Sequence, residues 1–286
     1  MQKIWQEAEA LQTELVERRR DLHRHPETGW TEFRTASIVI KELQALGYEV
    51  YMGDDALVEE EMMGLPVTEV LEQAMVRAVS EGADADLVEK MRGGKTGVVG
   101  VMKFSRPGKI LAFRFDMDCN DVEECDTADH RPLESGFQSL HAKEMHACGH
   151  DFHTTALLGV AKLLGGEREH IKGTVILLFQ PAEEAEHGGE KVVNTGMFEK
   201  YKIEKIFGLH TKQNMPVGTI AIAPGPFSAA VDRFLYTVKG MGCHGSAPQT
   251  GLDPIPAAAR LVGSLQEIVS RRISPMETAV ISVTRF

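Results

Sequence analysis

The chain has 286 residues, of which 43% are hydrophobic and 26% charged, and its formal net charge is −11. This length suits one large domain or two of modest size. No apolar run reaches the roughly 18 residues that a membrane-spanning helix needs, and residues 1–7 lack the apolar core of a secretory signal. Without a basic tract the acidic chain is not expected to bind nucleic acid, because such binding relies on neutralising phosphates.

The first part of the chain has the apolar spacing of two helices. Apolar residues recur at helical intervals over residues 2–24 and stop before Pro26. Thr31 is the predicted cap of a second helix that reaches Leu46, and Gly47 would end it.

An alternation of strands and helices follows an acidic, methionine-rich stretch at residues 52–95. We interpret that stretch, with helical runs near 67–79 and 84–91, as an insertion on the core fold. The alternation predicts an α/β fold with a mainly parallel sheet flanked by helices. In chain order the elements are strands at 98–104 and 110–115, a polar loop at 119–144, a helix at 152–164, a strand at 174–179, a helix near 188–195 and a strand near 205–210.

The pattern changes near residues 224–226, where two prolines flank a glycine. A strand at 234–238, a helix at 254–269 and a strand at 280–283 are predicted beyond this point. We therefore expect one domain at 1–227, carrying the 52–95 insertion, and the first part of a small α+β domain at 228–286.

Side chains with metal-binding chemistry follow successive strands or precede a helix. Cys148 and His150 lie in the loop before the 152–164 helix, Glu183 and Glu184 follow one strand, and His210 ends another. Ligand sites in parallel sheets form at the carboxyl ends of the strands, so these residues can converge there. Thiolate, imidazole and carboxylate together suit zinc or a similar divalent ion. Of two adjacent glutamates, one can bind metal while the other takes a proton from water.

Simpler interpretations stay open for individual residues. A glutamate pair alone is usually a solvated surface feature, and His210 could equally be a hydrogen-bonded strand-end histidine. Asp116 and Asp118 end a strand at the same edge and could either support ligands or cap backbone groups. The remaining cysteines are interpreted as structural thiols of a reducing cytoplasm, and four further histidines as surface residues: Cys119, Cys125 and Cys243; His130, His141, His170 and His187.

Taken together, these residues resemble the two-metal aminoacylase/carboxypeptidase group of metallopeptidases, in its amidohydrolase branch. The acidic insertion and residues 130–132 (HRP) look most like the A-type subunit of the aminobenzoyl-glutamate utilisation hydrolases. The resemblance covers essentially the whole chain. It is carried by residues 19–23 (RRDLH), 26–27 (PE), 115–118 (FDMD), 145–151 (MHACGHD), 180–184 (QPAEE), 208–210 (GLH) and 240–244 (GMGCH).

The resemblance implies a catalytic domain with two divalent metal ions, most simply zinc or manganese, and a lid domain that forms a homodimer. Glu183 would be the general acid/base, Asp118 would support the ligands, and His244 from the lid of the partner would stabilise the oxyanion. The substrate would be a small N-acyl or N-aroyl amino acid. The implied metal ligands are Cys148, which would bridge the ions, His150, Glu184 and His210.

Members of the family extend beyond this length and supply a further histidine ligand after the lid. A truncated, non-catalytic remnant is therefore one alternative function, and a dipeptidase or carboxypeptidase of the same family is another. With four candidate ligands we expect fewer than two tightly bound metal ions per chain. We also expect self-association through residues 231–286, because an incomplete lid would expose apolar surface.

Overall fold

The computed structural model describes residues 2–58, 62–184, 188–225 and 230–286. The chain divides into two compact units, residues 1–215 and residues 216–286. The domain boundary expected from the sequence, at 227/228, and His187 both lie outside the described residues. Each unit is described by itself.

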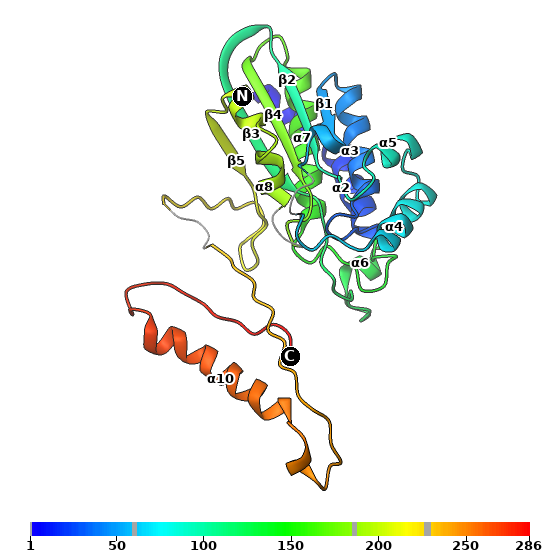
Figure 1. Cartoon of the computed structure of the whole chain (residues 1–286). Coiled ribbons are helices and arrows are strands. Elements are labelled where there is room, and N and C mark those ends of the chain that lie inside the picture. The colour runs from blue at the N-terminus through cyan, green and yellow to red at the C-terminus, as the bar shows by residue number, and fades with distance from the viewer. Residues whose placement is uncertain (1, 59–61, 185–187, 226–229) are drawn as a thin grey trace. The chain divides into compact units, whose positions relative to one another are not determined.

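Unit 1 is built on a five-stranded sheet in the order β1-β2-β4-β3-β5, with helices packed against it (Figure 1). β1 pairs antiparallel with β2 and β2 antiparallel with β4, whereas β3 pairs parallel with both β4 and β5. Four strands therefore run in one direction and β2 runs against them, which confirms the mainly parallel α/β fold. The strands are β1 (Glu49–Met52), β2 (Val98–Lys103), β3 (Arg106–Asp116), β4 (Lys172–Gln180) and β5 (Lys205–Gly208).

Both faces of this sheet are covered, because alternate side chains of a strand point to opposite faces. On β4, Val175, Leu177 and Phe179 join one core cluster, while Ile176 and Leu178 join another. The first cluster includes residues of α3 (Phe33–Ala45), α4 (Thr68–Ser80), α5 (Ala85–Lys90) and α7 (His150–Gly166), and the second includes residues of α8 (Gly188–Val193) and α9 (Met197–Tyr201).

The N-terminal helices differ from the expectation in two ways. The helical run 2–24 is divided at Leu11 into α1 (Gln2–Ala10) and α2 (Gln12–Arg24). Thr31 does not cap α3, because its hydroxyl donates to the carbonyl oxygen of Thr28 (2.7 Å). The end of α3 is as expected: Gly47 has φ +77, in the left-handed region that favours glycine.

The 52–95 stretch is continuous with the core of unit 1. Its helices α4 and α5 contribute Met75, Ala78, Leu87 and Val88 to the same cluster as α3 and the sheet. The short strand β1 was not anticipated, since four residues at the edge of a sheet leave little periodic signal. A four-residue helix, α6 (Arg131–Glu134), lies within the stretch expected to be a loop.

Unit 2 contains one long helix, α10 (Pro254–Arg272), capped by Asp253, whose carboxylate accepts from the N–H of Ile255 (3.0 Å). None of the α10 residues is buried. The strands predicted at 234–238 and 280–283 are not present. A strand forms only with a neighbour that completes its hydrogen-bond ladder, and neither segment has one among the described residues.

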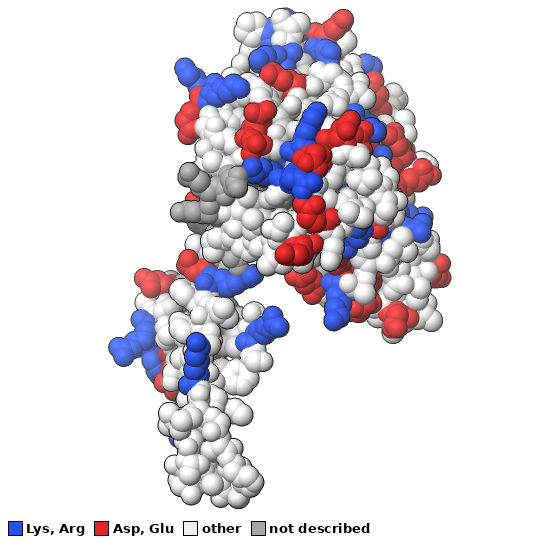
Figure 2. Space-filling view, turned by 45° about the vertical axis from the view of Figure 1, so that its right-hand side comes forward, with Lys and Arg blue, Asp and Glu red and all other residues white. Residues whose placement is uncertain are grey.

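Charges of both signs are interspersed on the face of the larger unit that Figure 2 shows. Some of the charges of unit 1 form local ion pairs: Arg18 lies 3.3 Å from Asp21 and 2.6 Å from Glu42. In the described parts of the chain, no helix combines the length and apolar character needed to cross a membrane.

His141 corrects the expectation of a surface histidine, because its side chain is only 8% exposed. Its Nδ1 donates to the carbonyl oxygen of Pro26 (2.8 Å), and its Nε2 donates to Glu81 Oε1 (2.7 Å). Burial opposes the charged ring, but the carboxylates of Glu144 and Glu81 outweigh it and raise the pKa of His141 to about 9. The imidazolium therefore ties the loop before residues 145–151 to the end of α4.

Replacing His141 with Gln should destabilise the protein more at about pH 6 than at about pH 10. The folded protein holds the proton more tightly than the unfolded chain, because the pKa rises from 6.5 to about 9. This stabilisation is complete below pH 6.5 and is lost as the pH rises through 9. Urea denaturation at the lower pH should register a loss of about 1.5–3 kcal/mol, as for other hydrogen bonds to charged groups.

His170→Gln is the matched control, because the His170 side chain is 72% exposed. It should change the free energy of unfolding by no more than about 0.5 kcal/mol at either pH. Equal destabilisation by His141→Gln at the two pH values would contradict the assignment of a charged His141.

Candidate metal centre

The centre lies where the parallel strands of unit 1 end. β3 ends at Asp116, β4 at Gln180 and β5 at Gly208. Because the three strands run in the same direction, the segments after them emerge at one edge of the sheet. The Cys148 loop reaches this edge as well, since His150 opens α7 and α7 packs against β3 and β4.

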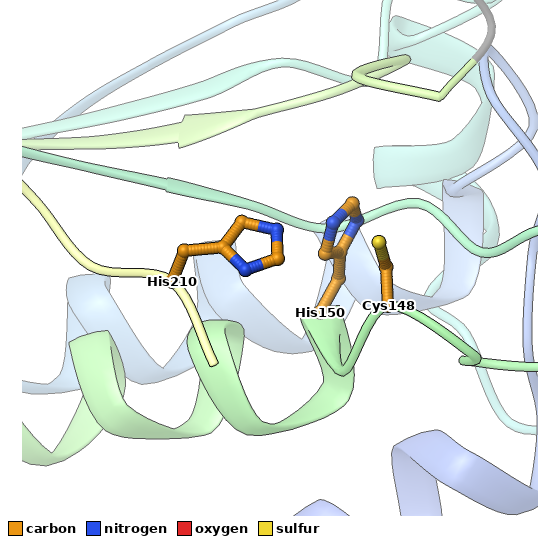
Figure 3. A group of neighbouring side chains, drawn as sticks. All are labelled: Cys148, His150 and His210. Atoms are coloured by element: carbon orange, nitrogen blue, oxygen red, sulfur yellow. The ribbon is translucent and has the colours of Figure 1, made fainter. Parts of the chain in front are cut away.

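Cys148, His150 and His210 point toward one another, with His150 between the other two (Figure 3). One donor atom from each lies within 4.8 Å of the others. His150, Glu183 and Glu184 form a second group with the same spacing. The structure thus brings together the five residues of unit 1 expected to bind metal or transfer protons, and His150 belongs to both groups.

His150 is oriented as a metal ligand would be. Its ring is fully buried, and Nδ1 donates to the carbonyl oxygen of Asp118 (2.9 Å), which directs Nε2 into the centre. Among the described residues Nε2 has no hydrogen-bond partner, and neither does Glu184 Oε1, which lies 3.7 Å away. Buried polar atoms are normally paired, so two that face each other unpaired fit a cation held between them.

The electrostatics of the centre come from crowded negative charge. Burial disfavours the charged form of His150, but the carboxylates of Asp118 and Asp116 raise its pKa to about 9. Burial and the neighbouring Glu184 raise the pKa of the Cys148 thiol to about 12. Burial and Asp116 also raise the pKa of Glu183. A divalent cation would reverse these preferences, since it favours a thiolate, neutral imidazole and ionised carboxylates.

Asp118 organises the glutamate pair. Its Oδ1 accepts from the N–H of Glu183 (3.0 Å) and its Oδ2 from the N–H of Glu184 (2.8 Å). The Asp118 side chain is fully buried, so these bonds are protected from water. Asp118, two residues beyond the end of β3, thereby fixes both the turn after β4 and the ring of His150.

Glu32, a residue that sequence reasoning missed, also fixes the turn that carries Glu183 and Glu184. Ala182 takes a left-handed φ of +50 directly before the glutamate pair, a conformation that is unfavourable for a residue with a Cβ. Its N–H donates to Glu32 Oε1 (2.7 Å), while Glu32 Oε2 accepts from the hydroxyl of Thr96 (2.5 Å). Burial, with Asp118 nearby, raises the pKa of Glu32 to about 8. Glu32 lies 150 positions before Ala182, and no sequence motif signals the pairing.

His153 was missed as well, although it lies one helical turn after His150 on α7. Its Nδ1 donates to Asp116 Oδ1 (2.5 Å) and its Nε2 accepts from the N–H of Thr211 (2.9 Å). His153, Asp116 and His150 form a third group with metal-binding geometry. Both nitrogens of His153 are already engaged, so the ring is less available as a ligand than His150.

His244 belongs to unit 2, where it is exposed and its Nδ1 lies 2.9 Å from the hydroxyl oxygen of Ser246. Its part in catalysis stays a prediction.

Comparison with known proteins supports a family assignment. The model of peptidase family M20/M25/M40 matches residues 112–284. An N-acetylcysteine deacetylase of Bacillus subtilis is 36% identical over 96% of this chain and 60% of its own length. A p-aminobenzoyl-glutamate hydrolase subunit of Escherichia coli is also 36% identical, over 94% of this chain and 61% of its own. The chain therefore spans about 60% of the length of these curated relatives.

Solved structures agree with this result. An aminobenzoyl-glutamate utilization protein from Klebsiella pneumoniae is 33% identical, with a TM-score of 0.63 over 76% of this chain and 48% of that one. A dinuclear metal binding peptidase from the M20 family of Bacillus subtilis is 29% identical, with a TM-score of 0.57 over 91% and 57% of the two chains. The expected resemblance is confirmed, and the chain belongs to the peptidase family M20/M25/M40.

Proposed function

We propose that this protein is a metal-dependent amidohydrolase that cleaves the amide bond of N-acyl or N-aroyl amino acids. The convergence of Cys148, His150 and His210 with the Glu183–Glu184 pair at one sheet edge carries this proposal. Relatives named deacetylase, p-aminobenzoyl-glutamate hydrolase and hippurate hydrolase support the substrate class. A cytoplasmic location fits the four cysteines, which are all free.

In this proposal Cys148, His150, Glu184 and His210 would be this chain's ligands in a centre for two divalent ions, which needs donors beyond these four to bind both ions tightly. The thiolate favours zinc, while carboxylate and imidazole ligands also accept manganese. Bound there, the ions would polarise the amide carbonyl and lower the pKa of water. The unpaired Nε2 of His150 and Oε1 of Glu184 are the atoms that support this assignment most directly.

Glu183 is the proposed general acid/base. Its side chain is 35% exposed, so water and substrate can reach it, whereas the ring of His150 beside it is fully buried. The raised pKa of Glu183 suits a group that must both take up and release a proton near neutral pH. The Glu183 carboxylate would accept a proton from the attacking water and deliver it to the departing amine, while Asp118 keeps its backbone in place.

We also propose that His244 stabilises the oxyanion of the tetrahedral intermediate. In this arrangement the domain expected at residues 228–286 forms the lid of a homodimer, and each lid serves the site of the partner.

Glu183→Gln should lower the rate of hydrolysis at least ~100-fold, because the amide cannot take up the proton. The assay would use the zinc- or manganese-loaded protein with p-aminobenzoyl-glutamate and hippurate as substrates. Metal content should stay unchanged in this variant, whereas Glu184→Gln should lose metal, since only Glu184 is a proposed ligand.

Glu199→Gln controls for the change in net charge, because Glu199 is an exposed residue of α9. A full rate for Glu183→Gln would sink the proposed mechanism. Turnover of dipeptides in preference to aroyl amino acids would favour the peptidase alternative, and metal binding without any turnover would favour a non-catalytic role.

Metal titration tests the ligand set separately. We expect fewer than two tightly bound ions per chain, because two ions need more donors than Cys148, His150, Glu184 and His210 provide. Cobalt bound at Cys148 should give a thiolate charge-transfer absorption, which Cys148→Ser should abolish. The serine variant should also weaken binding by more than the ~10–100-fold typical of losing an outer hydrogen-bond partner. An unchanged spectrum would refute Cys148 as a ligand, and two tightly bound ions would show that donors beyond these four residues take part.

A further inference from the structure

Thr211, the residue after His210, contacts both segments that flank the candidate metal centre. Its backbone N–H donates to His153 Nε2 (2.9 Å), and its hydroxyl donates to the carbonyl oxygen of Cys148 (2.8 Å). Neither contact uses a donor atom of Cys148, His150 or His210. Thr211 therefore joins the loop after β5 to the first turn of α7 and to the Cys148 loop.

The His153 end of this connection is rigid. The His153 ring is fully buried, and its Nδ1–H is fixed by the Asp116 carboxylate at the end of β3 (2.5 Å). Its Nε2 therefore carries the lone pair that accepts the Thr211 N–H. The rings of His153 and His210 lie with their centroids 4.7 Å apart. The Nδ1 of His210 donates to the carbonyl oxygen of Thr211 (2.7 Å), so a movement of Thr211 would carry the His210 ring with it.

Thr211 also packs closely against the backbone of the Cys148 loop. Gly149 has φ +84, and a Cβ added to it would lie 2.8 Å from the Thr211 hydroxyl oxygen. Glycine between Cys148 and His150 thus serves two purposes, since it permits the left-handed turn and makes room for the threonine. The side chain of Thr211 rests directly on the backbone that connects two candidate ligands.

The sheet alone holds His210 weakly. β5 has four residues, all exposed, and within the part of the chain that the structure describes it pairs only with β3. A short edge strand leaves the residues that follow it free to shift. Metal affinity depends on donors being placed before the ion binds.

From these contacts we infer that Thr211 is a positioning residue that fixes His210 at the separation from Cys148 and His150 required for metal binding. This inference rests on the proposed function, because it takes these three residues as ligands.

The test uses cobalt binding by the full 286-residue chain, monitored by absorption, with no need for turnover. Thr211→Val keeps the shape but removes the hydroxyl donor, and it should weaken cobalt binding by about 10–100-fold. Thr211→Ser keeps the donor and should restore affinity to within a few-fold of the original.

A double-mutant cycle separates positioning from general destabilisation. If Thr211 acts through His210, then Thr211→Val should have little further effect in a His210→Ala chain. Additive losses, or unchanged affinity in the single variant, would overturn the inference. Failure of the unaltered chain to bind cobalt would overturn both the inference and the metal centre, which distinguishes the two failures.

His153 provides a second pair of variants. His153→Gln can place an acceptor near the position of Nε2, whereas His153→Asn can only replace the donor at Nδ1. The Gln variant should therefore retain cobalt affinity better than the Asn variant. Higher cobalt affinity in the Asn variant than in the Gln variant would contradict a positioning role for the hydrogen bond from the Thr211 N–H to His153 Nε2.

Discussion

The fully buried carboxylate of Asp118 is the constraint on which the candidate centre depends. This carboxylate accepts hydrogen bonds from the consecutive backbone N–H groups of Glu183 and Glu184. The backbone carbonyl of Asp118 accepts from His150 Nδ1 and so orients the His150 ring. One residue just beyond the end of β3 thereby fixes both the turn after β4 and the orientation of the His150 ring at the start of α7. A charged acceptor makes stronger hydrogen bonds than a neutral one, and burial protects them from competing water.

A second hydrogen-bond network links the first turn of α7 to α2. Asp151 follows His150 directly, and its Oδ2 accepts from His23 Nδ1 (2.9 Å) and from Arg19 Nε (3.0 Å), both on α2. The Nε2 of His23 donates in turn to Glu124 Oε1 (3.0 Å). Burial opposes a charged His23, yet the carboxylates on both sides raise its pKa. Removing one member would leave buried charge uncompensated, which is strongly destabilising. The network therefore fixes the helix whose first residue points into the centre.

Hydrogen bonds to buried groups explain how exposed segments can form a defined centre. Glu183 and His210 lie in connections, where chains are usually mobile. Here each connection is tied to buried groups, through Asp118 and Glu32 in one case and through Thr211 and His153 in the other. The reacting side chains can stay accessible to substrate while their backbones are held by the core.

The sequence by itself determined the α/β class, the main strands and the residues at their carboxyl ends. Hydrophobic periodicity is local, and a parallel sheet gathers its strand ends at one edge, so the convergence of Cys148, His150 and His210 could be anticipated. Only the tertiary structure decided which buried groups hold them. The roles of Glu32 and His153, like the burial of His141, arise from contacts between distant segments, which no local pattern encodes. The same reason explains the absent strands at 234–238 and 280–283: an apolar run can favour an extended backbone, but only a hydrogen-bonded neighbour makes it a strand.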